Sequence, residues 1–203
     1  MLPKPHLSYS QWTVWKTNKD RFRREYFESG EKLDTEALRF GKSFALSIED
    51  GTYKDILPDL QVYPEVEFKI QLEVEGVPIL SYIDSYHPEL NVFHEYKTGK
   101  VPWTQVKVQK HDQLVFYAMA LRQLTGHMPE YCDLHWIETR PNSKKTEPQE
   151  GFSDTPEHAL ELTGRIEVFR RYFDIREVER MEKEIRQAAE EISEAYQKYI
   201  DEF

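Results

Sequence analysis

Two acidic residues and a lysine, Asp84, Glu95 and Lys97, lie close together in the sequence. In an extended strand, residues two apart point to the same face, so Glu95 and Lys97 share a face. A turn between Asp84 and Glu95 brings the two carboxylates side by side across an antiparallel pair. Carboxylate oxygens suit a hard cation such as Mg²⁺, which acidifies a bound water and neutralises charge on a phosphate. The chemistry indicated is phosphodiester hydrolysis.

The same three residues also admit a structural interpretation. Asp, Glu and Lys on neighbouring strands can form an exposed salt bridge, which contributes little to stability. This spacing also arises by chance in a chain rich in Lys and Glu. The surroundings of Asp84 favour a site, because it follows the uncharged run 79–83. A carboxylate on a partly buried strand needs a compensating partner.

Three strands are expected to position these residues. Residues 66–74 alternate apolar and polar side chains, which is typical of a half-buried strand. Two short polar turns follow, and they introduce strands at 77–86 and 92–99. The pattern predicts an antiparallel meander that carries Asp84 on its second strand and Lys97 on its third.

Helices are expected around these strands. The first is expected to begin with Ser10 as its N-cap, and the second to begin near Asp34 or Thr35 and stop at Gly51. A long helix is expected over 103–124, and a last helix begins with a capping box at Asp174. These helices account for most of the remaining aromatic and aliphatic residues.

Two further strands complete the expected fold, at 131–139 and 164–173. A polar, proline-containing loop, 140–158, separates them. The order of elements predicts an α/β (α+β) fold, with a mixed central sheet of about five strands flanked by helices. At 203 residues, the length favours a single domain over 1–203.

The composition of the chain argues against several classes of protein and of cofactor. The formal net charge of −10 argues against a protein that coats nucleic acid, although residues 16–24 and 97–110 are locally basic. Cys132 is the only cysteine, so neither an intrachain disulfide nor an iron–sulfur cluster is expected. The sequence has no apolar run of membrane-spanning length and no signal-peptide pattern. We therefore expect a cytoplasmic, reducing location and no membrane partner.

The segments around the candidate residues resemble a known family. "SYID" followed by "HEYKTGK" resembles the G-x-I-D…(D/E)-x-K-T-G core of the PD-(D/E)xK nuclease superfamily, in particular its RecB-like exonuclease branch. Phage-type recombination exonucleases are similar as well. "HDQLVFYAMAL" resembles the Q-x-x-x-Y motif of that branch, which places Gln113 and Tyr117 on one helix face. Weaker matches are "LSYSQWTVW", "ALRFGKSFALSIE" and "EVEFKIQLEVEGVPILSYID", the last of which aligns Glu67 with an acidic residue near the metal.

The resemblance implies a restriction-endonuclease-like core and a metal-dependent deoxyribonuclease, expected to be an exonuclease of DNA repair or recombination. Asp84 and Glu95 would bind Mg²⁺ or Mn²⁺, with the Tyr96 carbonyl as a further ligand. Lys97 would activate or stabilise the attacking water. Glu67 would lie near the metal, or would be an outward-facing strand glutamate. The expected DNA contacts are Gln113, Tyr117, Lys100, Lys107 and Lys110.

Two positions depart from the family pattern. Ala45 stands where many members carry a metal-binding His, with Glu49 one turn later, and Ser81 stands where Gly is usual. The missing His leaves open whether one metal or two bind. It also leaves open a catalytically weak or inactive nuclease-fold module that binds DNA or serves assembly. A structural protein that docks a partner through its acidic C-terminal helix is a third reading, and a homo-oligomer or a recombination or repair partner is not excluded.

Overall fold

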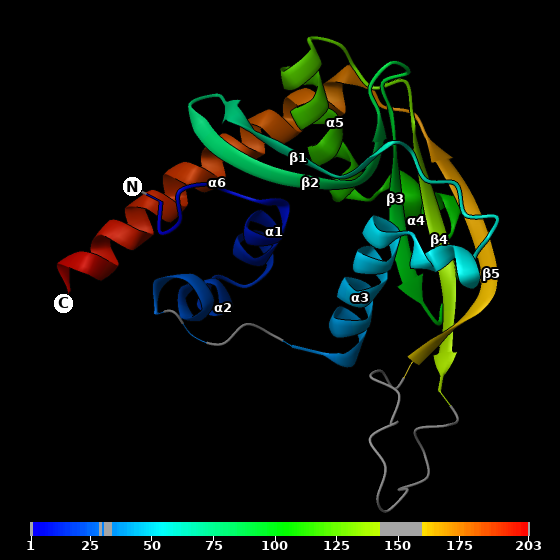
Figure 1. Ribbon diagram of the computed structural model, residues 1–203. Coiled ribbons are helices and arrows are strands. Elements are labelled where there is room, and N and C mark those ends of the chain that lie inside the picture. The colour runs from blue at the N-terminus through cyan, green and yellow to red at the C-terminus, as the bar shows by residue number, and fades with distance from the viewer. Residues whose placement is uncertain (1, 29, 31–33, 143–159, 203) are drawn as a thin grey trace, which may run out of the picture.

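The computed structural model describes residues 2–28, 30, 34–142 and 160–202 (Figure 1). Its strands form one sheet in the order β1-β2-β3-β4-β5, in which β3 and β4 are parallel and all other neighbours are antiparallel. The mixed five-stranded sheet predicted from the sequence is therefore confirmed. The strands are β1 Glu65–Val74, β2 Val77–His87, β3 Val92–Gly99, β4 Cys132–Pro141 and β5 Leu160–Arg171.

The first three strands form the predicted meander, but their pairing is uneven. β1 pairs with β2 from Val74↔Val77 as far as Glu65↔Tyr86. β2 pairs with β3 at three positions, and Ser85↔His94 is the last of them. Beyond that pair the two strands separate, so Asp84 and Glu95 lie at the opening between them.

The helices of the described residues lie on both faces of the sheet (Figure 1). Thr35 caps α3, Gly51 ends it in a left-handed conformation, and Asp174 with Glu177 forms the capping box of α6, all as predicted. A π-helical turn, Arg23–Phe27, follows α2. The helices are α1 Tyr9–Thr17, α2 Lys19–Phe22, α3 Glu36–Asp50, α4 Gln105–Gln109, α5 Asp112–Thr125 and α6 Ile175–Asp201.

The N-cap of α1 is Ser8, so the prediction of Ser10 was wrong. The Ser8 hydroxyl accepts from the Gln11 amide, and the Gln11 side chain accepts from the Ser8 amide at 2.7 Å. This reciprocal pair satisfies two backbone N–H groups, whereas a start at Ser10 would leave the Gln11 side chain without that role.

The single helix predicted over 103–124 was also wrong, since the chain breaks between α4 and α5. Arg171 of β5 donates from one guanidinium nitrogen to the carbonyl oxygens of Val108 and His111, at 3.1 and 2.8 Å. In a continuous helix, the Val108 carbonyl would accept from Asp112. In the structure that carbonyl accepts from the Arg171 guanidinium and from the His111 amide, each at 3.1 Å, and the helix restarts at Asp112.

Two apolar cores lie on opposite faces of the sheet. One joins α1, α5 and α6 to the face that carries Phe93, Leu134 and Trp136. The other packs Phe44 and Ile48 of α3 against Tyr96, Ile137 and neighbours on the opposite face. The opening between β2 and β3 therefore lies between α3 on one side and α5 on the other.

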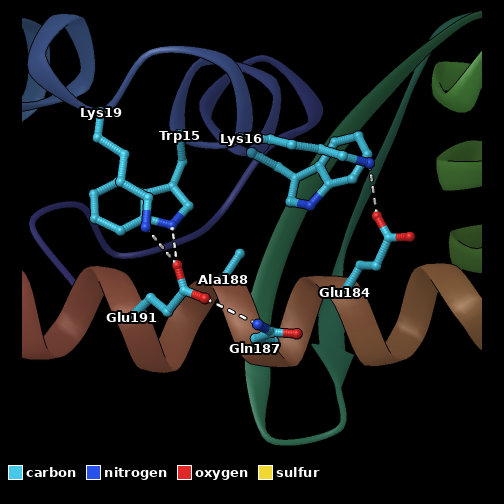
Figure 2. Close-up of a pocket in the computed structure, with 8 residues that line it drawn as sticks. Trp15, Lys16, Lys19, Glu184, Gln187, Ala188 and Glu191 are labelled. Carbon is cyan, nitrogen blue, oxygen red and sulfur yellow. Dashed lines mark hydrogen bonds and ion pairs between the residues drawn. The ribbon is translucent and has the colours of Figure 1, made fainter.

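A polar cluster, shown in Figure 2, joins the first two helices, α1 and α2, to the last helix, α6. Trp15 and Lys19 both donate to one oxygen of Glu191, at 3.0 and 2.9 Å. Lys16 pairs with Glu184 at 2.9 Å, and its ammonium lies 4.5 Å from the centre of the Trp12 ring. The acidic C-terminal helix thus packs on its own chain, through its buried apolar face and through these pairs. Within the described ranges, no helix has the length and apolar character needed to cross a membrane.

Candidate active site

Asp84 occupies the point where β2 and β3 separate. Its Oδ2 accepts from the Tyr96 amide at 2.7 Å, so the side chain takes the place that a strand carbonyl would have in a continued ladder. The sequence-predicted juxtaposition with Glu95 follows from the register, one step beyond Ser85↔His94. Burial of the carboxyl group, followed by the charge of Glu95, raises the pKa of Asp84 well above its usual value. Lys97 and the Tyr96 amide oppose that rise.

Glu95 and Lys97 lie on one face of β3, as two residues separated by one position should. The Glu95 side chain is 1% exposed and forms an ion pair with Lys97 through Oε1. Its second oxygen, Oε2, is buried without a hydrogen-bond partner among the described residues. A buried carboxylate oxygen in that state is costly, because its lost hydration is not replaced. Glu95 therefore has an unused acceptor directed into the protein.

The charge state of Lys97 follows from its surroundings. Burial works to lower the pKa of the ammonium, but the charges of Glu95 and Asp84 outweigh it, so the pKa lies above its ordinary value. Lys97 is consequently a cation at neutral pH. It can donate hydrogen bonds and stabilise negative charge, whereas taking a proton from water would first require it to lose one.

Gln113 holds Lys97 from the helix side. Its Oε1 accepts from the Lys97 ammonium at 2.9 Å, and its Nε2 donates to the Tyr117 hydroxyl at 2.7 Å. The two residues are four apart on α5, which places both on the face toward β3. Tyr117 is buried beneath Gln113. In this structure the pair orients the lysine, and Tyr117 does not reach the surface.

Glu67 lies opposite Asp84 in the β1–β2 register, between the pairs Val66↔Ser85 and Phe68↔Ile83, but these two residues are not themselves paired. The backbone of Glu67 is left-handed, with φ of 47°. For a residue with a side chain that conformation is uncommon and costs roughly 1–2 kcal/mol. Burial, and then the charges of Glu49 and Glu95, raise the pKa of Glu67. The strained residue is thus part of the same acidic group.

A small cavity of about 70 Å³ opens between α3 and this group. That volume exceeds the roughly 15 Å³ that one water centre requires, so it can hold a partly hydrated ion. Ala45 contributes to the wall from α3, on the side that faces Glu67 and Asp84. The cavity is lined by Gly41, Phe44, Ala45, Ile48, Glu67, Asp84 and Tyr96.

The residues fit a hard divalent cation by charge and by donor type. Asp84, Glu67 and Glu95 supply only oxygen donors, and burial, followed by the charges of neighbouring carboxylates, raises the pKa of Asp84 and of Glu67. The Glu95 oxygen without a partner is a further acceptor. In the part of the chain that is described, however, no three His, Cys, Asp or Glu side chains already converge as a metal-binding group. The Tyr96 carbonyl stays a predicted ligand.

The three lysines predicted to contact DNA follow β3 and are exposed. Lys107 lies over the ring of Trp103, 3.9 Å from its centre. Within the described chain, Lys100, Lys107 and Lys110 have no carboxylate at ion-pair distance. Whether they contact a substrate stays a prediction.

Two residues near the site escaped the sequence prediction. Tyr9, at the start of α1, interacts electrostatically with Lys97 and Glu95, and burial is the main cause of its raised pKa. His111 lies at the break before α5, where burial, and then Lys97 and Arg171, lower its pKa to about 4. The Ser8–Gln11 capping signature could have placed Tyr9 at the start of a helix, but no local signal brings that helix to β3.

Comparison with known proteins shows similarity at the level of fold. No protein-family model matches the sequence, and no curated protein matches it. A crystal structure of a protein from Eubacterium rectale, described as a "putative exonuclease", is similar, with a TM-score of 0.57 and 14% sequence identity. The match covers 93% of this chain and 82% of that one. The two proteins therefore share a fold, a mixed sheet flanked by helices.

Proposed function

We propose that the chain is a metal-dependent DNA nuclease of the PD-(D/E)xK type, in its RecB-like exonuclease branch. The observation that carries the proposal is the meeting of a half-buried carboxylate, Asp84, and a buried one, Glu95, with Lys97 where two strands separate. An ordinary exposed salt bridge needs none of this burial. The shared fold with the protein described as a "putative exonuclease" supports the same reaction class.

Asp84 and Glu95 would hold Mg²⁺ or Mn²⁺, together with the Tyr96 carbonyl and Glu67. When bound, such an ion supplies positive charge at the scissile phosphate and makes a water easier to deprotonate. Asp84 is preorganised for this task, because the Tyr96 amide fixes one of its oxygens. Glu95 contributes the oxygen that lacks a partner in the described structure.

Lys97 would stabilise the reacting phosphate as an ammonium. Its raised pKa keeps the proton on the nitrogen, so donation to the attacking water or to a phosphate oxygen is favoured over removal of a proton from water. Gln113 orients the ammonium through their 2.9 Å hydrogen bond, and Tyr117 fixes Gln113 in turn. Lys100, Lys107 and Lys110 would contact DNA phosphates, which position a strand without reading its sequence.

The test is cleavage of end-labelled linear DNA with Mg²⁺, with Mn²⁺ and with EDTA. We expect wild type to release nucleotides from ends only when a metal is present. Lys97→Ala should lower the rate at least about a hundredfold, the scale of losing one preorganised donor. Lys183→Ala, which removes an exposed cation of α6, is the matched control and should leave the rate unchanged. Equal rates for wild type and Lys97→Ala would refute the assignment.

Further arms of the same assay address the finer predictions. Cleavage of closed circular DNA would replace the exonuclease assignment by an endonuclease, and preferential cleavage of RNA would replace the substrate. Size measurement of the purified protein tests for a homo-oligomer. The proposal also includes two predictions from the sequence: a cytoplasmic location, and a partner in recombination or repair.

A second candidate is a nuclease-fold module that binds DNA without cutting it. The observation in its favour is Ala45, which leaves the α3 wall of the cavity without a metal-binding side chain. Under this alternative, DNA affinity would persist in EDTA and no metal would produce cleavage. Binding with no metal-dependent product in any of the assays above would select it.

A further inference from the structure

The segment that follows the catalytic strand combines exposed apolar side chains with cations. Val101 is 75% exposed and Val106 is 64% exposed. No acidic residue occurs from Thr98 to His111, while three lysines do. Exposed valines bring no benefit to a surface that meets only phosphates, so this composition fits a ligand with both an apolar and an anionic part.

Trp103 lies in the middle of this segment and is partly accessible. The chain has four tryptophans, all in its described part, and the other three, Trp12, Trp15 and Trp136, are buried. The Lys107 ammonium lies over the Trp103 ring at 3.9 Å, and the His111 ring meets it edge-on at 4.8 Å. The partly accessible indole, which also packs against the core, is therefore covered on one side by the Lys107 ammonium.

This segment is continuous with the candidate site. His111 contacts Trp103 and interacts with both Lys97 and Gln113. Gln113 holds the Lys97 ammonium at 2.9 Å. The His111 ring and the side-chain amide of Gln113 thus lie between the Trp103 indole and Lys97. A DNA strand stacked on Trp103 would therefore lead to the candidate site.

We propose that Val101, Trp103 and Val106, with Lys100, Lys107 and Lys110, form a platform that binds single-stranded DNA next to the catalytic group. A base stacks on the indole in place of the Lys107 ammonium, which moves to a phosphate. This inference rests on the proposed nuclease function and deepens it by naming the form of the substrate.

The exchange at the indole is favourable in magnitude. A cation over an exposed ring contributes about two- to fivefold in equilibrium terms. A base stacked on an aromatic side chain contributes roughly five- to a hundredfold in affinity. The displaced ammonium also gains a phosphate contact. A duplex gains little from the platform, because its base faces are already stacked on one another.

Tryptophan fluorescence tests the platform without any cleavage. In EDTA, the protein is titrated with a single-stranded thymine oligonucleotide and with a blunt hairpin duplex of equal phosphate count. We expect the single strand to quench the emission, because Trp103 is the accessible tryptophan, and to bind at least about tenfold more tightly than the duplex. Trp103→Phe should lose the quenching and keep affinity within about threefold, measured by anisotropy of a labelled strand.

Two further variants sharpen the result. Trp103→Ala should weaken single-strand binding about tenfold or more and change duplex binding less than threefold, whereas Lys183→Ala should change neither. Equal quenching by the duplex, or unchanged single-strand affinity in Trp103→Ala, would overturn the platform. Because the titration contains no metal, it is independent of cleavage. If single-stranded DNA quenches the emission but no metal-dependent cleavage occurs, the nuclease assignment fails and the platform stands. If cleavage occurs without quenching, the platform fails and the nuclease assignment stands.

Discussion

Two lysine–glutamate pairs in this molecule, Lys19–Glu191 and Lys97–Glu95, differ in whether both oxygens of the glutamate have hydrogen-bond partners. Glu191 lies at the surface and accepts from Lys19 and Trp15 through one oxygen and from Gln187 through the other. Hydrogen bonds, the one from Lys19 first, lower its pKa. Glu95 is buried beside Lys97, and one of its oxygens has no partner among the described residues. The neighbouring Asp84 has a raised pKa.

The difference separates a structural pair from a candidate catalytic one. Both oxygens of Glu191 have hydrogen-bond partners, so Glu191 joins Trp15 of α1 and Lys19 of α2 to α6 and leaves no carboxylate oxygen without a partner. Around Asp84 and Glu95 the carboxylates outnumber the cations, and Glu67 adds left-handed backbone strain. A fold keeps such an arrangement at a cost in stability, which is typical of functional sites.

The largest effect is expected from Asp84→Asn. The amide keeps the oxygen that accepts from the Tyr96 amide but loses the charge that would hold a metal. We expect metal-dependent cleavage to fall by about a thousandfold or more, with loss of the metal-induced rise in melting temperature. Cleavage assays and thermal melts with and without Mn²⁺ measure both. Glu191→Gln, the matched carboxylate-to-amide change in the satisfied pair, should leave both unchanged, and equal losses in the two variants would contradict the comparison.

Filling the position of the missing histidine should give an intermediate effect. Ala45→His adds an imidazole to the wall of the cavity that contains Asp84 and Glu67. We expect the apparent affinity for Mn²⁺ to rise about tenfold, and the affinity for Mg²⁺ to change less, because imidazole suits the transition metal better. Leu46→His, on the exposed neighbouring position, is the control. An equal gain in both variants, measured by calorimetry, would show that position 45 does not face the metal.

The two regions should also respond to pH in opposite directions. The folded-state pKa of Asp84 is raised, so the native metal-free protein binds more protons than the unfolded chain and Asp84 costs stability as pH rises. Metal-free Asp84→Asn should therefore be more stable than wild type at pH 8, with the advantage shrinking as pH falls toward 3.8. The pKa of Glu191 is lowered, so its stabilisation is present above 4.5 and is lost as pH falls through the lowered value. Denaturant titrations of wild type and both variants in EDTA test this, and parallel trends would be inconsistent with it.

The smallest effect is expected from Glu191→Gln on stability itself. The carboxylate is largely exposed, so solvent screens its ion pair with Lys19, and the amide oxygen can still accept from Trp15. We expect a loss below about 1 kcal/mol at neutral pH, as for other surface pairs. A loss of several kcal/mol in urea titrations would mean that this pair is far less exposed to water than its geometry indicates.

The sequence predicted those features that depend on neighbouring residues. The alternation in 66–74 and the two turns determine the meander, and the spacing of Gln113 and Tyr117 places them on one helix face. The features that were missed depend on distant residues. At the break before α5, the Val108 carbonyl accepts from Arg171, which lies 63 positions away in the sequence. The approach of Tyr9 to Lys97 depends on tertiary packing. Neither leaves a local pattern.

The Arg171 contacts have a consequence for the order of folding. Its guanidinium joins the Val108 and His111 carbonyls to Glu177 at the start of α6. Until β5 and α6 have docked, the Val108 and His111 carbonyls lack their hydrogen bonds from the Arg171 guanidinium. Contacts this distant in sequence carry a large loop-closure cost and form late. We therefore expect Gln113 to reach its place beside Lys97 only in the last steps of folding, after the C-terminal third of the chain has been synthesised.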